Sequence, residues 1–504
     1  FSGKFGMPAL ILFIGIGMLF GSDGIVKIPF DNFAVTEQIC TIALGFIMFY
    51  GGFNTKWKAA KPVAVKSLLL STTGVFLTGF LTMVFCCVVL KFRFAEGFLL
   101  GAVISCTDAA SVFSILRKKK LNLKDGVASL LEIESGSNDP TAYMLTVVGI
   151  SLVNGENLST VPYAIFAQIV YGVAIGVVLA VFGIWVLTKT RVVTNGMYTV
   201  FILALVLFGM GFSSLVGGNA FLSIYLLGIL MGNSSIRNKK EIIPFFDGVT
   251  GLSQIVIFFL LGLLSFPHKF PYIMGTAIVI ALFILLIARP VTVLLILKPF
   301  HCSLNQCLLV SWAGLRGASS IVFSIFAISR DLFHIVFMIS LLSVAVQGTL
   351  LPYVSRKLDM IDDKADVQKT FNDYQEEESI SFVKFHLFSQ HPYVGKCLKE
   401  ITLPPKLLVV VLIRGKEVLV PNGDTCLQAG DLMIAAAEEF EDRKNMTLRE
   451  ITVDKNHKWK GRSLSRIPMQ AGTLIVMIRR GKETVIPTGN TVVYEGDVLV
   501  QAKF

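Results

Sequence analysis

The chain has 504 residues and a mass of 55.2 kDa; 54% of its residues are hydrophobic and only 16% are charged. Soluble globular proteins carry about 25% charged residues, so the composition excludes an ordinary soluble enzyme. The 40 phenylalanines exclude a disordered chain. A net charge of +11 indicates either a nucleic-acid partner or the inner surface of a membrane.

The first 355 residues form a succession of apolar runs. Most runs reach the roughly 20 residues that a membrane-spanning helix needs, and they mostly lack the polar stripe of a soluble helix. We therefore predict a polytopic α-helical membrane domain over residues 1–355. Its twelve predicted spans are 7–20, 34–52, 64–90, 96–116, 127–153, 161–188, 197–213, 217–232, 248–265, 271–297, 304–328 and 332–355.

The chain begins with Phe1-Ser2-Gly3-Lys4 and then enters an apolar run. This start resembles the end of a truncated helix, so we expect thirteen spans in the native protein, with the first mostly missing here. No signal peptide is recognisable.

The basic residues support this domain and orient it. Residues 1–355 contain 23 Lys and Arg against 13 Asp and Glu, whereas residues 356–504 contain 22 against 21. If the polar C-terminal part is cytoplasmic, the predicted inside loops hold 15 Lys and Arg and the outside loops hold 5. This bias agrees with the positive-inside rule. It predicts a cytoplasmic tail and removes the case for nucleic acid, because the charge lies at loop ends.

Eight cysteines are present. Six lie in or near predicted spans, and Cys397 and Cys426 lie in the polar part. No C-x-x-C pair or spaced framework occurs, so we expect free thiols in a reducing compartment.

Ionisable residues inside predicted spans are costly and indicate function. The first, Asp108, lies in the run Gly101–Ser111 of small and hydroxylated residues, which includes Thr107. Such a segment can unwind and present carbonyls to a cation, although small residues also serve helix packing. The six candidates are Asp108, Glu132, Glu134, Asp139, Arg289 and Arg316.

Three of the acids lie in the run Leu131–Pro140. Helical spacing places Glu132, Ser135 and Asp139 on one face. Asp139 has no obvious local partner, so it is the better candidate for an ion ligand.

An arginine between glycines deep in a span requires a carboxylate partner. Arg316 stands between Gly314 and Gly317. We predict that it forms a structural ion pair with Glu134, with Glu132 as the second candidate. Arg289 precedes Pro290 near a helix end, where it can extend to the interface.

A carboxylate pocket at mid-membrane, with hydroxyls and free carbonyls, suits a hard monovalent cation. Low dielectric disfavours the charged carboxylate, so a proton can compete with the cation for the same group. Such competition is sufficient for antiport, and it fits the absence of a phosphate-binding loop in this sequence.

The tail begins with a charged linker over 356–380 and then repeats itself at an offset of 66 residues. We predict two α+β modules over 381–443 and 444–504, each with a strand, a short helix and three strands. Hairpin turns are expected at Gly415 and Gly481, and also at Asn422-Gly423 and Thr488-Gly489. The tail has no metal-ligand spacing or nucleophile motif, which favours a regulatory role over catalysis.

The motifs Thr107–Ala110, Glu134–Pro140 and Gly314–Gly317 resemble those of NhaP-type (CPA1) monovalent cation/proton antiporters, over about residues 5–355. Within that family the sequence is similar to the NhaP2-type potassium/proton antiporters. The resemblance implies a thirteen-helix NhaA/NhaP-like fold with inverted repeats, and a homodimer that works by an elevator-like motion.

The resemblance also implies roles for individual residues. Asp139 would bind the cation and the proton in turn, with the Thr107 carbonyl and Ser135 as further cation ligands and Asp108 in support. Asn138 occupies a position where electrogenic relatives carry a second Asp, which suggests electroneutral exchange.

The tail resembles two RCK-C (TrkA-C) modules without a preceding nucleotide-binding Rossmann half, so NAD or ATP is not expected there. Some RCK-C dimers bind cyclic di-AMP, and a similar regulator could contact the arginines of the hairpins. The alternative is that these arginines are simply exposed hairpin charges. They are Arg414, Arg479 and Arg480.

The function that these features predict is K⁺/H⁺ exchange by alternating access in a bacterial cytoplasmic membrane, without an enzymatic activity or a bound cofactor. The main alternative is a Na⁺/H⁺ antiporter, because the same oxygens serve both cations. A ligand-gated cation channel is a different class, and the absence of a TVGYG-like filter speaks against it.

Overall fold

A computed structural model describes the chain from Ala9 to Lys503. The chain forms two compact units, residues 1–367 and 368–504. The first eight residues and most of the predicted linker lie outside the described residues. The residues not described are 1–8, 56, 58–60, 109–110, 113–114, 117–118, 120, 157, 190–196, 237–238, 327–329, 363–379, 390, 402, 404–406, 416, 439–446, 456, 470–472, 482, 486 and 504.

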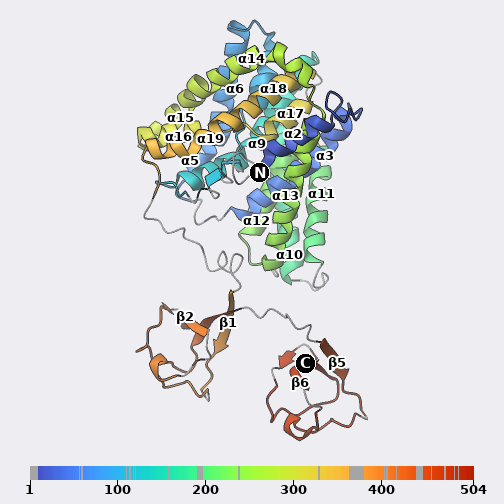
Figure 1. The fold of residues 1–504 in the computed structure, drawn as a ribbon, viewed down its shortest axis with the longest axis vertical. Coiled ribbons are helices and arrows are strands. Elements are labelled where there is room, and N and C mark those ends of the chain that lie inside the picture. Colours follow the sequence, from blue (N-terminus) through green and yellow to red (C-terminus); the bar gives the residue numbers. More distant parts are fainter. Residues whose placement is uncertain are drawn as a thin grey trace. The chain divides into compact units, whose positions relative to one another are not determined.

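The first unit is helical, and each of the twelve predicted runs contains helix (Figure 1). Seven helical stretches of the described residues are long and apolar enough to cross a membrane. The α-helices are α2 (Ala9–Phe20), α3 (Phe33–Asn54), α5 (Ala64–Leu69), α6 (Val75–Val88), α7 (Phe94–Ile104), α9 (Val127–Val153), α10 (Val161–Lys189), α11 (Tyr198–Leu215), α12 (Ala220–Gly232), α13 (Lys239–Leu263), α14 (Phe270–Phe283), α15 (Arg289–Leu297), α16 (Leu304–Trp312), α17 (Ala318–Phe326), α18 (Arg330–Leu342) and α19 (Thr349–Lys357).

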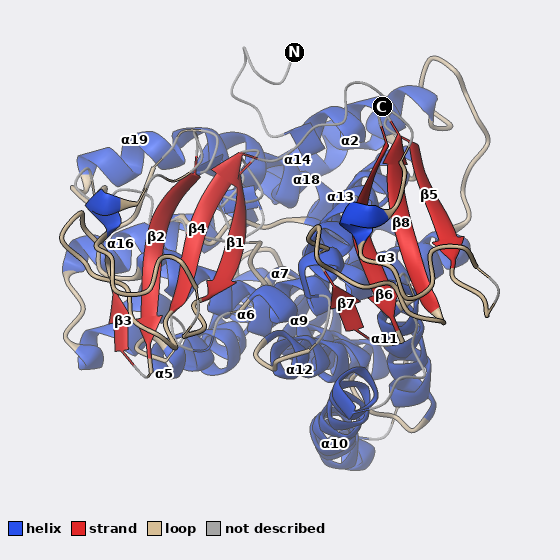
Figure 2. Cartoon of the chain, turned by 90° about the horizontal axis from the view of Figure 1, so that it is seen from below, coloured by secondary structure: helices blue, strands red, loops and turns tan. Residues whose placement is uncertain are grey.

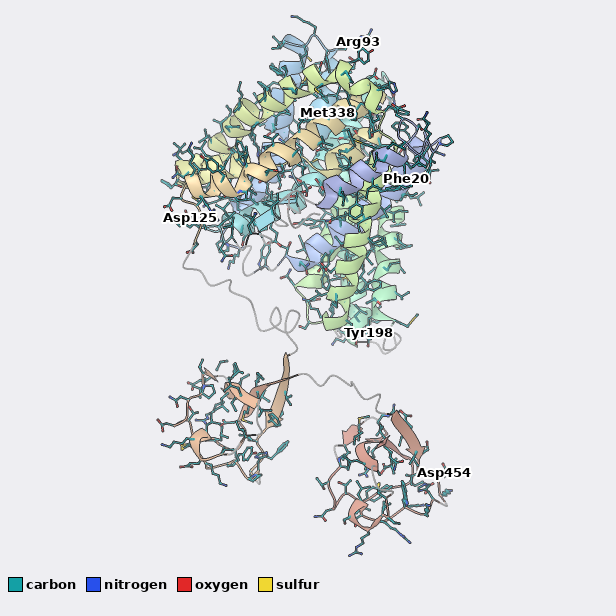
Figure 3. All side chains as sticks on the ribbon, in the orientation of Figure 1. Phe20, Arg93, Asp125, Tyr198, Met338 and Asp454 are labelled. Carbon is teal, nitrogen blue, oxygen red and sulfur yellow. A yellow bond between two sulfur atoms is a disulfide. The ribbon has the colours of Figure 1, made fainter. Side chains whose placement is uncertain are left out.

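Two residues in or beside predicted loops lie at opposite ends of the helical unit. Arg93 lies at the upper end of the unit and Tyr198 at the opposite, lower end (Figure 3). The sequence places Arg93 in a predicted outside loop and Tyr198 directly after a predicted inside loop.

Two of the predicted spans are interrupted. α7 ends at Ile104 and the next residues are not helical, whereas α16 ends at Trp312 and α17 begins at Ala318. The break after α7 falls within the run of small residues that predicted an unwound segment. In both places the helix stops where glycine, serine or threonine weakens it.

The same order of elements surrounds both interruptions. A helix with a π-helical turn precedes each one: η1 (Leu70–Gly74) joins α5 to α6, and η4 (Ile284–Ala288) joins α14 to α15. A long helical stretch follows each one, namely α9 and the combination of α18, η6 (Ser343–Gly348) and α19. This order fits the expected internal repeats.

The tail contains two four-stranded antiparallel sheets with orders β1-β4-β2-β3 and β5-β8-β6-β7 (Figure 2). Each module has a strand, a one-turn 3₁₀ helix and three strands, as predicted. The first has β1 (Ile380–His386), η7 (Leu398–Glu400), β2 (Leu407–Arg414), β3 (Glu417–Leu419) and β4 (Leu432–Glu438). The second has β5 (Thr447–Thr452), η8 (Leu464–Arg466), β6 (Thr473–Arg480), β7 (Glu483–Val485) and β8 (Asp497–Lys503).

The two kinds of predicted turn have different outcomes. Gly415 and Gly481 have φ values of 61° and 58° in the hairpins β2–β3 and β6–β7, so that prediction is confirmed. The hairpin prediction at Asn422-Gly423 and Thr488-Gly489 is wrong. The chain turns at both places, but β4 pairs with β2 rather than with β3, which precedes it in the chain. In the second module β8 likewise pairs with β6 rather than with β7.

The prediction of free thiols is wrong for Cys397 and Cys426, which form a disulfide. They are paired across an isolated bridge that joins the start of η7 to the segment before β4. The second module has the same bridge between Ser463 and Val492. The backbone bridge is therefore part of the fold of both modules, whereas the disulfide occurs at the bridge of the first module.

Candidate ion-binding site

The two interrupted helices meet at their breaks. The Asp108 backbone N–H donates to the Leu315 carbonyl at 2.8 Å. The Arg316 guanidinium donates through Nη1 to the carbonyls of Ser105 and Cys106 at 2.8 and 2.6 Å. These carbonyls lie just beyond the last residue of α7, where helix ends leave carbonyls without helical donors, and a buried cationic side chain from the other break donates to them.

The glycines on either side of Arg316 make room for other charged groups. A Cβ at Gly317 would collide with the Asp108 carboxylate, and one at Gly314 would lie 2.7 Å from Arg289 Nε. The Gly-Leu-Arg-Gly motif thus allows two further ionisable side chains to approach the backbone of this break.

Asp139 lies on α9 beside these breaks and is 3% exposed. Its Oδ2 accepts a hydrogen bond from Ser319 Oγ at 2.6 Å. Among the described residues, its Oδ1 accepts no hydrogen bond. The Cys106 thiol lies next to the same carboxylate. A buried carboxylate oxygen without a donor is costly unless a proton or a cation occupies it.

The other predicted ligands gather around Thr107, which belongs to the first break. Ser135 Oγ donates to the Thr107 carbonyl at 2.8 Å, and Asn138 Nδ2 donates to Thr107 Oγ1 at 2.6 Å. Asn138 Oδ1 accepts no hydrogen bond from the described part of the chain. The structure therefore brings Thr107, Ser135, Asn138 and Asp139 together, and their role as ligands stays a prediction.

Asp108 has a local structural contact. Its carboxylate accepts from the Ser111 backbone N–H at 3.3 Å and from Ser111 Oγ at 2.7 Å. An acidic side chain that accepts from the N–H three residues later is typical of a helix N-cap. Asp108 thus caps the helical residues that follow the break, and its supporting role at the ion site stays a prediction.

The predicted ion pair between Glu134 and Arg316 is wrong. Glu134 Oε1 accepts from Arg289 Nη2 at 2.6 Å, and the two side chains are 1% and 3% exposed. Arg289 therefore does not extend to the interface, because it is buried against Glu134. Glu132, the second candidate, has an exposed side chain. The partner of Arg316 is instead the backbone of the first break.

The tail arginines also have partners within their own modules. Arg414 Nε and Nη2 donate to both oxygens of Asp431 at 2.9 and 2.8 Å, and Arg480 does the same to Asp497. Each guanidinium lowers the pKa of its buried aspartate. Arg479 forms a surface ion pair with Glu450. A phosphate would have to compete with these ion pairs.

From the sequence alone, no role in the site was assigned to two of its residues. Ser319 and Arg289 contact carboxylates 180 and 155 residues away in the chain. The only sequence signal for Ser319 was its position in the run of small residues after Arg316. Helical periodicity did not indicate whether Ser319 or Ser320 would face the carboxylate. For Arg289 the signal was a charge inside an apolar run.

Comparison with known families agrees with this architecture. The sodium/hydrogen exchanger transmembrane family matches residues 1–357. The chain belongs to this family. Its members are cation/proton antiporters, so the first unit is a multi-pass membrane transporter domain. TrkA-C domains match residues 389–439 and 448–500, one in each tail module.

Individual relatives cover most of the chain. The K(+)/H(+) antiporter NhaP2 of Shewanella sp. (strain ANA-3) is 31% identical over 450 residues, which is 87% of this chain and 78% of that protein. The K(+)/H(+) antiporter NhaP of Alkalimonas amylolytica is 32% identical over 444 residues, or 86% and 77%. The chain is therefore NhaP2-like, with C-terminal TrkA-C modules.

A solved structure shows the same helical fold. The sodium proton antiporter MjNhaP1 from Methanocaldococcus jannaschii matches with a TM-score of 0.62 at 22% identity. The match covers 71% of this chain and 94% of that one.

Proposed function

We propose that this protein exchanges K⁺ for H⁺ across the bacterial cytoplasmic membrane, and that the two ions compete for Asp139. The observation that carries the proposal is a buried carboxylate beside two broken helices, whose Oδ1 accepts no hydrogen bond from the residues that the structure describes. A proton or a cation at that oxygen removes the cost of the buried charge, so the site is either protonated or cation-bound as it crosses the barrier.

The choice of K⁺ and the stoichiometry rest on separate arguments. The 31–32% identity to proteins named K(+)/H(+) antiporters supports K⁺. Asn138 cannot titrate, so Asp139 is left as the one exchanging carboxylate of the Asn-Asp pair. One proton per monovalent cation gives electroneutral exchange by alternating access.

We propose that the tail regulates this exchange from the cytoplasm, that the protein works as a homodimer, and that the tail ligand is a cyclic dinucleotide such as cyclic di-AMP. The 3:1 excess of basic residues in the predicted inside loops supports the cytoplasmic placement. The match of both modules to TrkA-C domains supports a sensing role.

The test is proton movement in proteoliposomes on addition of K⁺, Na⁺ or Li⁺, with and without cyclic di-AMP. K⁺ should dissipate an imposed pH gradient at a rate that does not depend on membrane potential. Exchange with Na⁺ but not K⁺ would replace this proposal by the Na⁺/H⁺ alternative. Cation flux without proton movement would indicate a channel.

A further inference from the structure

The second broken helix supplies a hydroxyl donor to the proposed ion-binding carboxylate. Ser319 is the second residue of α17, and its Oγ lies 2.6 Å from Asp139 Oδ2. Both side chains are buried, at 9% and 3% exposed. A hydrogen bond to a charged carboxylate is stronger than one between neutral groups, because the charge is desolvated.

The position of Ser319 is fixed by the contacts of the break that precedes it. Arg316 is bonded to the carbonyls of Ser105 and Cys106, and the Leu315 carbonyl accepts from Asp108. These contacts tie the start of α17 to the residues that lead to Thr107. The hydroxyl therefore has a defined place relative to the carboxylate.

The consequence concerns the other carboxylate oxygen. With Oδ2 occupied by Ser319, Asp139 presents Oδ1, which accepts no hydrogen bond from the described residues. Asn138 Oδ1 on the same helix is also buried without a donor among those residues. A hydroxyl that donates its hydrogen keeps oxygen lone pairs that can bind a hard cation.

We propose that Ser319 is a positioning residue for cation binding, which orients the Asp139 carboxylate and adds a hydroxyl oxygen to the cation site. This inference rests on the function proposed above. Its effect is on affinity for the cation rather than on the rate of the transport step, since Ser319 carries no charge that moves between protonation states.

The adjacent residue provides a matched control. Ser320 is also a buried serine of α17, but its hydroxyl contacts the Cys106 sulfur at 3.1 Å rather than Asp139. The variants Ser319→Ala and Ser320→Ala therefore remove the same group from neighbouring positions of one helix.

The experiment is K⁺/H⁺ exchange in proteoliposomes with the full chain. In Ser319→Ala the apparent KM for K⁺ should rise about tenfold, with kcat within twofold of wild type. Ser320→Ala should leave both values within about twofold. Ser319→Thr retains the hydroxyl and should return the KM to within about threefold of wild type. An unchanged KM in Ser319→Ala, a loss confined to kcat, or a Thr variant as weak as the Ala variant would overturn the assignment.

A binding measurement covers variants that reconstitute poorly. Added K⁺ should raise the Tm of the detergent-solubilised protein, because a ligand stabilises the state that binds it. Ser319→Ala should require about tenfold more K⁺ for the same rise, and an unchanged dependence contradicts the inference. Asp139→Asn separates the two proposals. If it retains exchange, the proposed function fails, whereas an inactive Asp139→Asn with normal Ser319→Ala overturns this inference alone.

Discussion

Buried aspartates in the membrane unit and in the tail differ in how completely their oxygens are bonded. Asp431 and Asp497 each bind a guanidinium through both oxygens and also accept a backbone N–H. Asp139 is equally buried, but a single hydroxyl donates to one of its oxygens and the other accepts no hydrogen bond from the described residues.

The difference separates structural charge from exchangeable charge. A carboxylate held by a bidentate arginine stays ionised and stabilises its fold. A carboxylate with an unpartnered oxygen is poorly stabilised by the protein alone, so it can accept an ion. Low solvent exposure is common to all three aspartates, whereas completeness of the hydrogen bonding separates Asp431 and Asp497 from Asp139, the proposed exchange site.

The largest expected effect is on Asp139. Asp139→Asn removes the exchangeable charge and should lower K⁺-driven proton movement at least 100-fold, while the elution profile and Tm remain close to wild type. Asp431→Asn in the tail is the matched control and should retain transport. Exchange by Asp139→Asn at near wild-type rates would remove the basis of the comparison.

The buried pair Glu134–Arg289 should behave as a structural pair. Removing one partner leaves an uncompensated charge, so Arg289→Met should destabilise the membrane unit by about 3–5 kcal/mol. Thermal unfolding in detergent measures this loss. Removing both charges in Glu134→Gln/Arg289→Met should restore part of it. A double variant that is no more stable than Arg289→Met would show that the two residues are not coupled.

The two modules allow the disulfide to be tested within one chain. Cys397 and Cys426 are 29 residues apart, and such a cross-link stabilises by about 3.6 kcal/mol in the loop-entropy model. Reduction of the full chain should therefore increase amide hydrogen exchange in the first module, and leave the second, with Ser463 and Val492, unchanged. An equal change in both modules would contradict this prediction.

The smallest effect concerns the tail ion pairs. Their arginines are about one-third exposed, so Asp431→Asn should destabilise the first module by only about 1–2 kcal/mol. Because each arginine lowers the pKa of its aspartate, the stabilisation is present above the ordinary Asp pKa of about 3.9 and is lost as the pH falls through the lowered value.

Amide exchange measured from about pH 5 down to about pH 2 in the full chain, corrected for the intrinsic pH dependence of exchange, would detect this acid weakening in both modules. Asp431→Asn should remove the pH dependence from the first module only, with the unaltered second module as its control. Acid weakening that persists in the first module would assign it to other groups.

Local pattern was sufficient for most elements of this protein but not for their pairings. The run of small residues before Asp108 predicted the first break, whereas the segment around Arg316 was predicted as part of one uninterrupted span and is in fact the second break. The 66-residue offset predicted both modules, including the equivalence of Arg414 and Arg480. The strand order of the sheets was harder to predict from the sequence, since β4 follows β3 in the chain but is separated from it in the sheet by β2.

The sequence by itself determined the membrane class, the cluster of ionisable residues and the duplicated tail, because hydrophobic period, charge position and repetition are properties of short segments. Only the tertiary structure decided that Glu134 pairs with Arg289, that Arg316 binds carbonyls, and that Ser319 reaches Asp139. These partners are more than 150 residues apart, and their meeting depends on helix packing that no local spacing encodes.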